Sequence, residues 1–387
     1  MLEEVAERGF LSTGDGVCRE HVLDRFLLDQ LSDISTPSRC AVCGQTMLRY
    51  VGVDELRDIV VAVIEAYRRR AIDELYLDDE TGSGYALSDT DIEDTTDVVY
   101  ALFGEAFDDR LMDYVTRTLD EEQWFDPGVL WLRGADLYLY SWQRFRGVLR
   151  SSPVNLSNLL AGELDDPRRT SEPADGIPPS QILPKLWDLI DTLGLVLEVP
   201  ASNEWVRAIY VPTGEHLSAS RLGTAPGACS TENRINRASE PMFYGAADEE
   251  TALREVGEAR TNIQTVIGTW EPSRPLYALD LVDLPSPPHL YDVKNAAARW
   301  QLCFLADFAV DVSQPVGTHA PNEYRATQIF MDFLRKSGID GIVYRSSRTG
   351  ERCCALDVDN AHCIDRDVPI ERVGDLHLIL KQWRIES

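Results

Sequence analysis

The sequence predicts an α+β protein, with a mainly helical first half followed by a mixed, β-rich second half. Apolar residues recur at helical spacing in the first 150 residues, and the clearest helix is expected over 53–76. In the second half, short β-type runs such as 265–270 alternate with helical stretches. Between the halves, a stretch rich in Pro, Ser and Asp is typical of a linker. The expected segments are 1–50 with a metal-binding knuckle, 51–150 as a helical domain, 151–180 as the linker, and 181–387 as the second domain.

Length and charge limit the classes of function. The chain has 387 residues, of which 44% are apolar, so it can form two or three domains with sizeable cores. Its formal net charge of −28 repels nucleic acid, so we expect no nucleic-acid partner. No apolar run approaches the roughly 20 residues of a membrane span, and the N-terminus lacks the basic start of a signal peptide. Eight cysteines in so long a chain do not predict a disulfide scaffold, and the cytoplasm is the expected compartment.

Two pairs of potential metal ligands lie near the N-terminus. They are Cys18 with His21 and Cys40 with Cys43, and two residues separate the members of each pair. This spacing allows both ligands of a pair to reach one ion, and Gly44 permits the tight turn of a knuckle. Four protein ligands leave no open position, so we predict a structural zinc. The alternative is a set of scattered thiols, and His21 is the weakest ligand because the pattern predicts a helix start there.

A second candidate site surrounds Glu255. An apolar run that ends at Tyr244 predicts a buried strand, and Asp248 is the expected N-cap of the helix that follows. On that helix Glu255 falls among small apolar residues, where a carboxylate needs a partner. Arg234 and Arg237 are the candidate partners. The pattern fits either a structural arginine–glutamate pair or a pocket that binds an anion and stabilises a developing cation.

The same stretch resembles the core of the RES domain, a family named for its Arg, Glu and Ser. The matching residues are Asn233, Arg234, Tyr244, Thr251, Ala252, Leu253 and Glu255. The run WVRAIY, which contains Arg207, resembles the family's opening strand, and GIDGIVYRSS places the family's serine at Ser346. The resemblance covers about two fifths of the chain, 205–359. It implies an ADP-ribosyltransferase-like fold and an activity that destroys NAD.

The resemblance also implies roles for six side chains. Glu255, Arg234 and Ser346 would be catalytic, and Arg207, Asn233 and Tyr244 would bind the substrate. A carboxylate stabilises the oxocarbenium character that develops on the ribose when nicotinamide leaves. Guanidinium groups suit the pyrophosphate, and a tyrosine ring can stack on nicotinamide. The sequence departs from the family at Ile209, where a second arginine is common, and at 349–352, where Gly-Gly and Asn are usual.

The first half resembles the all-helical HEPN-like domain that precedes some RES domains. RNases of the HEPN class carry an Arg-x4–6-His motif, and residues 1–150 contain no such motif. We therefore expect a sensor or partner-binding module, with an antitoxin or a regulatory protein as its partner. The acidic stretch 71–97 predicts a solvated loop, and mimicry of a phosphate backbone is the alternative.

The predicted function is that of a toxin-like enzyme with NAD as its substrate, which cleaves the nicotinamide–ribose bond under the control of the N-terminal domain. The acceptor would be phosphate in a phosphorolysis or water in a hydrolysis. Two alternatives stay open. One is a catalytically silent module that senses NAD or ADP-ribose, and the other is an ADP-ribosyltransferase that modifies a macromolecule. The sequence also leaves open whether the protein forms an oligomer.

Overall fold

The computed structural model describes most of the chain. The described residues are 10–71, 92–126, 134–152, 154–166, 176–214, 222–224, 232–257, 263–313, 322, 324–358 and 378–386. Most of the acidic stretch 71–97 therefore falls outside the described residues, as does part of the expected linker. Within them, no helix is both long enough and apolar enough to cross a membrane.

The chain forms two compact units. We call them the N-terminal unit, Met1–Asp136 with Pro287–Trp300, and the C-terminal unit, Leu137–Ser286 with Gln301–Ser387. The four segments expected from the sequence stay a prediction, and this division adds two details to it. Most of the helix at 134–151 belongs to the C-terminal unit, and a short segment of the second half belongs to the N-terminal unit.

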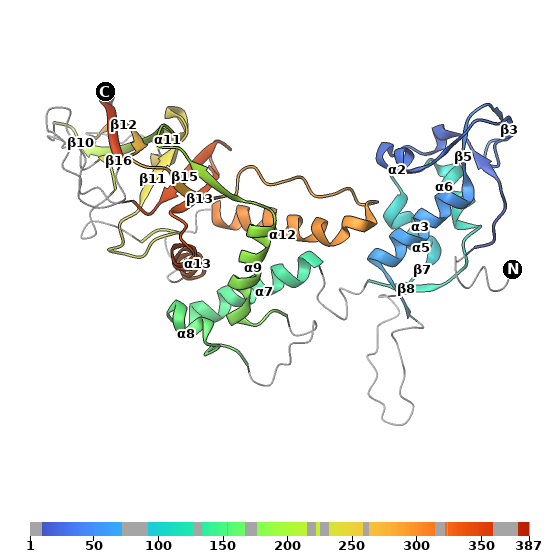
Figure 1. The fold of residues 1–387 in the computed structure, drawn as a ribbon, viewed down its shortest axis with the longest axis horizontal. Coiled ribbons are helices and arrows are strands. Elements are labelled where there is room, and N and C mark those ends of the chain that lie inside the picture. The colour runs from blue at the N-terminus through green and yellow to red at the C-terminus, as the bar shows by residue number, and fades with distance from the viewer. Residues whose placement is uncertain are drawn as a thin grey trace. The chain divides into compact units, whose positions relative to one another are not determined.

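The N-terminal unit is mainly helical (Figure 1). Its helices include α2 (Arg25–Gln30), α3 (Val53–Tyr67), α5 (Thr95–Phe103) and α6 (Asp109–Thr116). Its short strands are β1 (Gly16–Val17), β2 (Asp33–Ile34), β3 (Ser38–Arg39), β4 (Thr46–Met47), β5 (Tyr50–Gly52), β6 (Arg69–Arg70), β7 (Ile92–Asp94) and β8 (Gln123–Phe125). They form small sheets in the orders β1-β5-β2, β3-β4 and β6-β8-β7. Asp24, Asp94 and Asp108 each cap a helix, since each carboxylate accepts a hydrogen bond from the backbone N–H three residues on.

Helix α3 supplies much of the core of this unit. Val60, Val63 and Ile64, which belong to the predicted apolar stripe, are at most 1% exposed. The helix ends at Tyr67, earlier than the expected 76, because the chain turns extended and pairs β6 with β8. Burying the stripe of α3 against α5 and the small sheets is what makes this half a folded unit.

A segment from far along the chain completes this core. Tyr291 is 9% exposed, and its ring stacks on Phe103 with 5.0 Å between ring centroids. Its hydroxyl donates to the carbonyl oxygen of Leu102 at 2.9 Å. The hydroxyl of Tyr67 donates to the carbonyl oxygen of Leu290 at 3.0 Å. Pro287–Trp300 is therefore part of the N-terminal unit, although sequence order places it in the second half.

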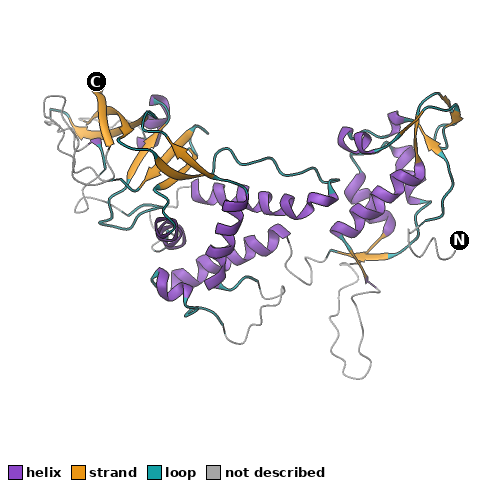
Figure 2. Ribbon diagram, in the orientation of Figure 1, coloured by secondary structure: helices purple, strands orange, loops and turns teal. Residues whose placement is uncertain are grey.

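The C-terminal unit is built on an eight-stranded mixed sheet (Figure 2). Its strands are β9 (Val196–Val199), β10 (Trp205–Pro212), β11 (Phe243–Ala246), β12 (Ile263–Pro272), β13 (Leu276–Asp280), β14 (Gly341–Arg345), β15 (Arg352–Leu356) and β16 (Leu378–Glu386). The order is β16-β12-β10-β11-β15-β14-β13-β9, and only β13 and β14 run parallel among the pairs described. With the helical N-terminal unit, this sheet confirms the predicted α+β class.

Helices of the C-terminal unit pack against one another through aromatic side chains. They are α7 (Gly134–Ser151), α8 (Leu156–Leu160), α9 (Pro179–Thr192), α11 (Glu249–Val256), α12 (Ala296–Ser313) and α13 (Arg325–Lys336), of which α12 belongs to this unit from Gln301 on. Phe308 of α12 contacts Trp142 of α7 and Phe330 of α13, each edge to face. These contacts fix α12 and α13 beside each other. Both helices contact the candidate functional site.

Part of the expected linker folds onto the C-terminal unit. Helix α8 lies inside 151–180, and its Leu159 is fully buried. The carboxylate of Asp165 accepts hydrogen bonds from the backbone N–H of Ser180 at 3.0 Å and from its hydroxyl at 2.6 Å. Residues 167–175 lie outside the described residues.

The role of Tyr291 in the N-terminal unit is testable. Tyr291→Ala removes a buried ring and should lower the free energy of unfolding of that unit by roughly 3 kcal/mol or more. Tyr291→Phe loses only the hydrogen bond and should cost about 1 kcal/mol. Tyr277, 48% exposed on the C-terminal unit, provides the matched control Tyr277→Ala. Hydrogen exchange of α3 and α5 amides measures the effect, and unchanged protection in Tyr291→Ala would refute it.

Candidate functional site

The candidate pocket is formed where β11 passes into α11. Asp248 caps α11 by accepting a hydrogen bond from the backbone N–H of Thr251 at 2.8 Å, as the sequence predicts. Gly257 ends the helix with φ of +100°, a conformation that side chains rarely adopt. Gly245 is required by space, because a Cβ there would lie 2.7 Å from the ring of Phe243. These local constraints place Glu255 at the last turn of α11.

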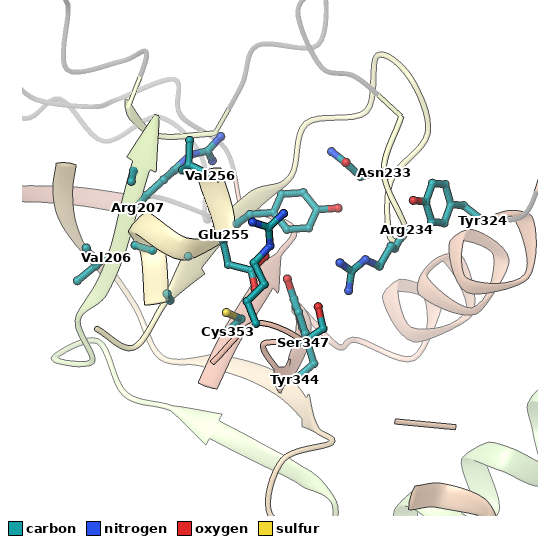
Figure 3. Close-up of a pocket in the computed structure, with 16 residues that line it drawn as sticks. Val206, Arg207, Asn233, Arg234, Glu255, Val256, Tyr324, Tyr344, Ser347 and Cys353 are labelled. Carbon is teal, nitrogen blue, oxygen red and sulfur yellow. The ribbon is translucent and has the colours of Figure 1, made fainter. Parts of the chain in front are cut away.

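A cavity of about 380 Å³ opens beside Glu255 (Figure 3). Five of the six side chains expected at the site line it: Arg207, Asn233, Arg234, Tyr244 and Glu255. Ser346 is not among the lining residues, whereas its neighbour Ser347 is. Val206, Ala208, Ala252, Val256, Tyr324, Tyr344, Arg348 and Cys353 contribute further walls. In Figure 3 Asn233, Arg234 and Tyr324 lie on one side of Glu255, and Arg207 lies on the other.

Ser346 contacts Glu255 directly. The Ser346 hydroxyl donates a hydrogen bond to Oε1 of Glu255 at 2.5 Å, and Ser346 is 3% exposed. The same hydroxyl oxygen accepts the backbone N–H groups of Arg348 at 3.1 Å and Thr349 at 3.2 Å. Its donor is therefore turned to the carboxylate and not to the cavity. In this structure Ser346 therefore holds one carboxylate oxygen of Glu255, and its hydroxyl makes no contact with the cavity.

The two arginines near Glu255 have different surroundings. Arg234 donates to the carbonyl oxygens of Val312, at 3.3 Å, and Ser313 at the end of α12, and its guanidinium lies over the ring of Tyr344. Arg237 instead pairs with Asp332 at 2.6 Å and with Glu240 at 3.1 Å. Within the described residues, neither arginine forms the ion pair with Glu255 that the structural alternative required.

Burial keeps two tyrosines and one cysteine of the cavity neutral. It raises the pKa of the hydroxyl of Tyr244, so this hydroxyl stays protonated and donates to Oδ1 of Asn236 at 2.7 Å. It also raises the pKa of Tyr344, and it raises the pKa of the Cys353 thiol to about 12. A protonated thiol is a poor nucleophile. Cys353 is therefore a wall of the cavity, and its thiol is no candidate nucleophile.

Arg207 lines the cavity from β10. Its guanidinium lies over the ring of Phe243, with 5.6 Å between the guanidinium carbon and the ring centroid. Ile209, where the family often has a second arginine, packs instead against the apolar core of the sheet. The positive charge that β10 brings to the cavity therefore comes from Arg207.

The predicted metal ligands converge in the N-terminal unit. The ligand atoms of Cys18, His21, Cys40 and Cys43 all lie within 4.8 Å of one another. The sulfur atoms of Cys18 and Cys43 are 3.6 Å apart, close to the edge of about 3.8 Å expected of a tetrahedral zinc site. Gly44 adopts φ of +74°, which closes the knuckle as expected. The cluster could hold a metal ion.

The surroundings of these ligands affect metal binding in different directions. His21 lies at the end of a 3-10 turn (Arg19–His21), and its Nδ1 contacts Oδ2 of Asp108 at 2.6 Å. The other ring nitrogen, Nε2, is buried and has no hydrogen-bond partner in the described structure. With Nδ1 held by Asp108, Nε2 is the atom that faces the cysteines. Burial raises the pKa of Cys18 to about 12. For Cys40 burial acts in the same direction, but backbone N–H groups of Cys43, Cys18 and Val42 lower its pKa to about 6, so its thiolate is favoured.

Two contacts at these sites had no signal in the sequence. Asp108 is 87 residues from His21, and its sequence context indicates only a helix cap. Asn236 follows Arg234 by two residues, yet nothing in the sequence shows that it receives the hydroxyl of Tyr244. Both depend on tertiary contacts.

Two domain families match parts of the chain. Residues 204–379 match the RES domain, and residues 33–152 match the HEPN/RES N-terminal domain 1. No curated protein matches the chain. Among solved structures, the Mycobacterium tuberculosis MbcT-MbcA toxin-antitoxin complex is similar at 13% identity, over 52% of this chain and 92% of that chain. The TM-score is 0.29, so this similarity carries no argument about the site.

The family matches cover the described site residues of the second half, from Arg207 to Ser346, and most of the helices of the first half. Cys18 and His21 precede the first matched residue, 33. The chain therefore contains a RES domain at 204–379, preceded by a HEPN/RES N-terminal domain 1 at 33–152.

Proposed function

We propose that this protein is an NAD-consuming enzyme that cleaves the bond between nicotinamide and ribose. The observation that carries the proposal is the carboxylate of Glu255, which lines a cavity inside a RES domain and has one oxygen held by Ser346. A carboxylate placed in this way meets a positive charge that exists only in the transition state. The cytoplasmic location inferred from composition fits such a substrate.

The chemistry can be assigned to side chains of the cavity. The C–N bond breaks with its electron pair on nicotinamide, which leaves as a neutral base, and the ribose takes oxocarbenium character that Glu255 stabilises. Arg234 and Arg207 bind the pyrophosphate, and the ring of Tyr244 stacks on nicotinamide. An oxygen of phosphate or water then attacks the ribose carbon and loses its proton. Incubation with NAD, with and without phosphate, identifies the acceptor from the product, ADP-ribose or its phosphate.

The same assay separates the alternatives. A protein that binds NAD without releasing nicotinamide would be a sensing module, and label transferred to a macromolecule would indicate an ADP-ribosyltransferase. We favour the enzyme because Glu255 has no ion-pair partner among the described residues, whereas a structural carboxylate in this position would be expected to have one. The N-terminal unit would then act as a sensor or as the surface for an antitoxin or regulatory protein.

Glu255→Gln is the central test. The substitution keeps the shape and removes the charge, so turnover should fall about 10²–10³-fold while NAD still binds. Its melting temperature should stay close to that of the wild type. Glu250→Gln, on the same helix with a side chain 79% exposed, is the matched control and should turn over normally. Normal turnover in Glu255→Gln, or a much lower melting temperature, would show that Glu255 is structural.

Ser346→Ala tests whether Glu255 must be oriented. Loss of one hydrogen bond to a charged group costs about 1.5–3 kcal/mol, so the rate at saturating NAD should fall roughly 10–100-fold. The affinity for NAD should change little, because the Ser346 hydroxyl faces Glu255 and not the cavity. Ser347→Ala removes a hydroxyl that does line the cavity and serves as the comparison. A Ser346→Ala variant that mainly loses affinity would assign its hydroxyl to the substrate instead.

We also propose that the cluster in the N-terminal unit holds one structural zinc ion. Cys18, His21, Cys40 and Cys43 would complete a tetrahedral set, and Asp108 would fix the ring of His21 through Nδ1. Four protein ligands leave the ion closed to substrate. Its contribution is therefore to the stability of the N-terminal unit.

Metal analysis of the purified protein tests this site. The wild type should carry one equivalent of zinc, and Cys40→Ser should lose it. Asp108→Asn should keep the fold but weaken zinc affinity about 10–100-fold, measured by competition with a chromogenic chelator. Cys303→Ser, a half-buried cysteine of α12 outside the cluster, is the control. Less than half an equivalent of zinc in the wild type would contradict the proposal.

A further inference from the structure

Helix α13 contacts the loop 232–237, which we call the pocket loop. Gln328 of α13 is 2% exposed. Its side-chain amide Nε2 donates to the carbonyl oxygens of Asn233 at 3.0 Å and Asn236 at 3.1 Å, and to Oε1 of Glu232 at 3.1 Å. The neighbouring Thr327 hydroxyl donates to the carbonyl oxygen of Arg234. One turn of helix therefore binds three backbone carbonyls of one short loop.

These contacts hold a segment that has no regular secondary structure. The pocket loop belongs to no helix or strand, so no ladder of backbone hydrogen bonds fixes it from outside. Within the loop, the backbone N–H of Asn233 donates to the carbonyl oxygen of Asn236 at 3.0 Å. Buried carbonyls need donors, and here side chains of α13 supply them. Gln328 and Thr327 thus hold the backbone of the loop, whereas Arg234, Asn236 and Arg237 hold it through their side chains.

The pocket loop carries groups that face the cavity. Asn233 and Arg234 are lining residues, and Asn236 accepts the hydroxyl of the lining residue Tyr244. Gln328 itself does not line the cavity, and among the described residues its amide nitrogen donates to the pocket loop alone. A shift of the loop would move Asn233, Arg234 and the acceptor of Tyr244 together.

We propose that Gln328 is a positioning residue of the pocket, whose buried amide holds the pocket loop in the conformation that directs Asn233 and Arg234 to the substrate. The proposal rests on the proposed function for the identity of the substrate, NAD. Asn233 and Arg234 meet groups that are present before the reaction, and Glu255 lies on a different element. Losing the amide should therefore weaken substrate binding more than it slows the chemical step.

The experiment replaces the amide in the full-length protein. Gln328→Leu keeps most of the volume and removes the donors. Two readouts are needed: hydrogen exchange of the pocket loop without any ligand, and steady-state kinetics with NAD. We expect exchange of the loop amides at least tenfold faster than in the wild type, KM raised about 10–100-fold, and kcat within about threefold of the wild type. Thr327→Val, which removes one donor, should give the same pattern with a smaller shift.

Phe330→Leu is the control for a general loss of stability. Phe330 is fully buried on the same helix and packs against Phe308, so this variant weakens α13 without touching the donors of the loop. The proposal requires KM and loop exchange in Phe330→Leu to stay near the wild type. It is overturned if Phe330→Leu reproduces the rise in KM, or if Gln328→Leu leaves both readouts unchanged.

The two readouts also separate this proposal from the proposed function. Should the wild type neither bind nor turn over NAD, the proposed function falls, and loop exchange in Gln328→Leu still decides whether the amide holds the loop. Should the wild type turn over NAD while Gln328→Leu matches it in KM and in loop exchange, only the role of Gln328 falls. Should Gln328→Leu fail to fold, Thr327→Val decides by the same two readouts.

Discussion

The hydrogen bond between Ser346 and Glu255 depends on the register of three strands. β11 and β14 both pair antiparallel with β15, so they run in the same direction and their C-terminal ends lie at the same edge of the sheet. The backbone N–H of Ala247, just after β11, donates to the carbonyl oxygen of Arg352 at 2.9 Å, and Arg345 at the end of β14 pairs with the same residue. Helix α11 therefore starts beside the turn that begins at Ser346. A slip of one residue in β15 would separate the carboxylate from its hydroxyl.

The positive charge at the cavity depends on which arginines already form ion pairs with carboxylates. The protein carries a net charge of −28, so an anionic substrate needs positive charge concentrated locally. Arg237 is neutralised by Asp332 and Glu240. Arg234 contacts only carbonyl oxygens and the ring of Tyr344 among its described partners, and these fix its position without cancelling its charge. The end of α12 thus orients a cation at the wall of the cavity, where the proposed substrate NAD would place its dianionic pyrophosphate.

Motif residues and local signals could be predicted from the sequence. Asp248 caps α11 because the cap needs only a side chain three residues from a backbone N–H. The four metal ligands converge because short spacing brings each pair together, and only the meeting of the two pairs needs tertiary structure. The sequence could not decide between Arg234 and Arg237, which are three residues apart and differ in what α12 and α13 bring to them.

Contacts between residues far apart in the sequence could not be predicted for the same reason. Ser346 was expected to donate to the substrate, and the structure turns its hydroxyl to a carboxylate 91 residues away. Helix α3 was expected to reach 76, but strand pairing with β8 overrides the helical preference after Tyr67. Tyr291 lies in the middle of the RES match and yet packs on Phe103 of the N-terminal unit. No periodicity or motif in the sequence indicates contacts of this kind.

The position of Tyr291 limits how the proposed control by the N-terminal unit can be tested. A chain shortened to 181–387 would lack α3 and α5, so Leu290 and Tyr291 would lose the surface that buries them. A shortened N-terminal unit would in turn lack a ring that stacks on Phe103. Either truncation would change stability as well as the proposed regulation, so a loss of activity would have two causes. Point substitutions in the full chain, at the metal ligands or at Tyr291, change the N-terminal unit while every residue of the cavity stays in place.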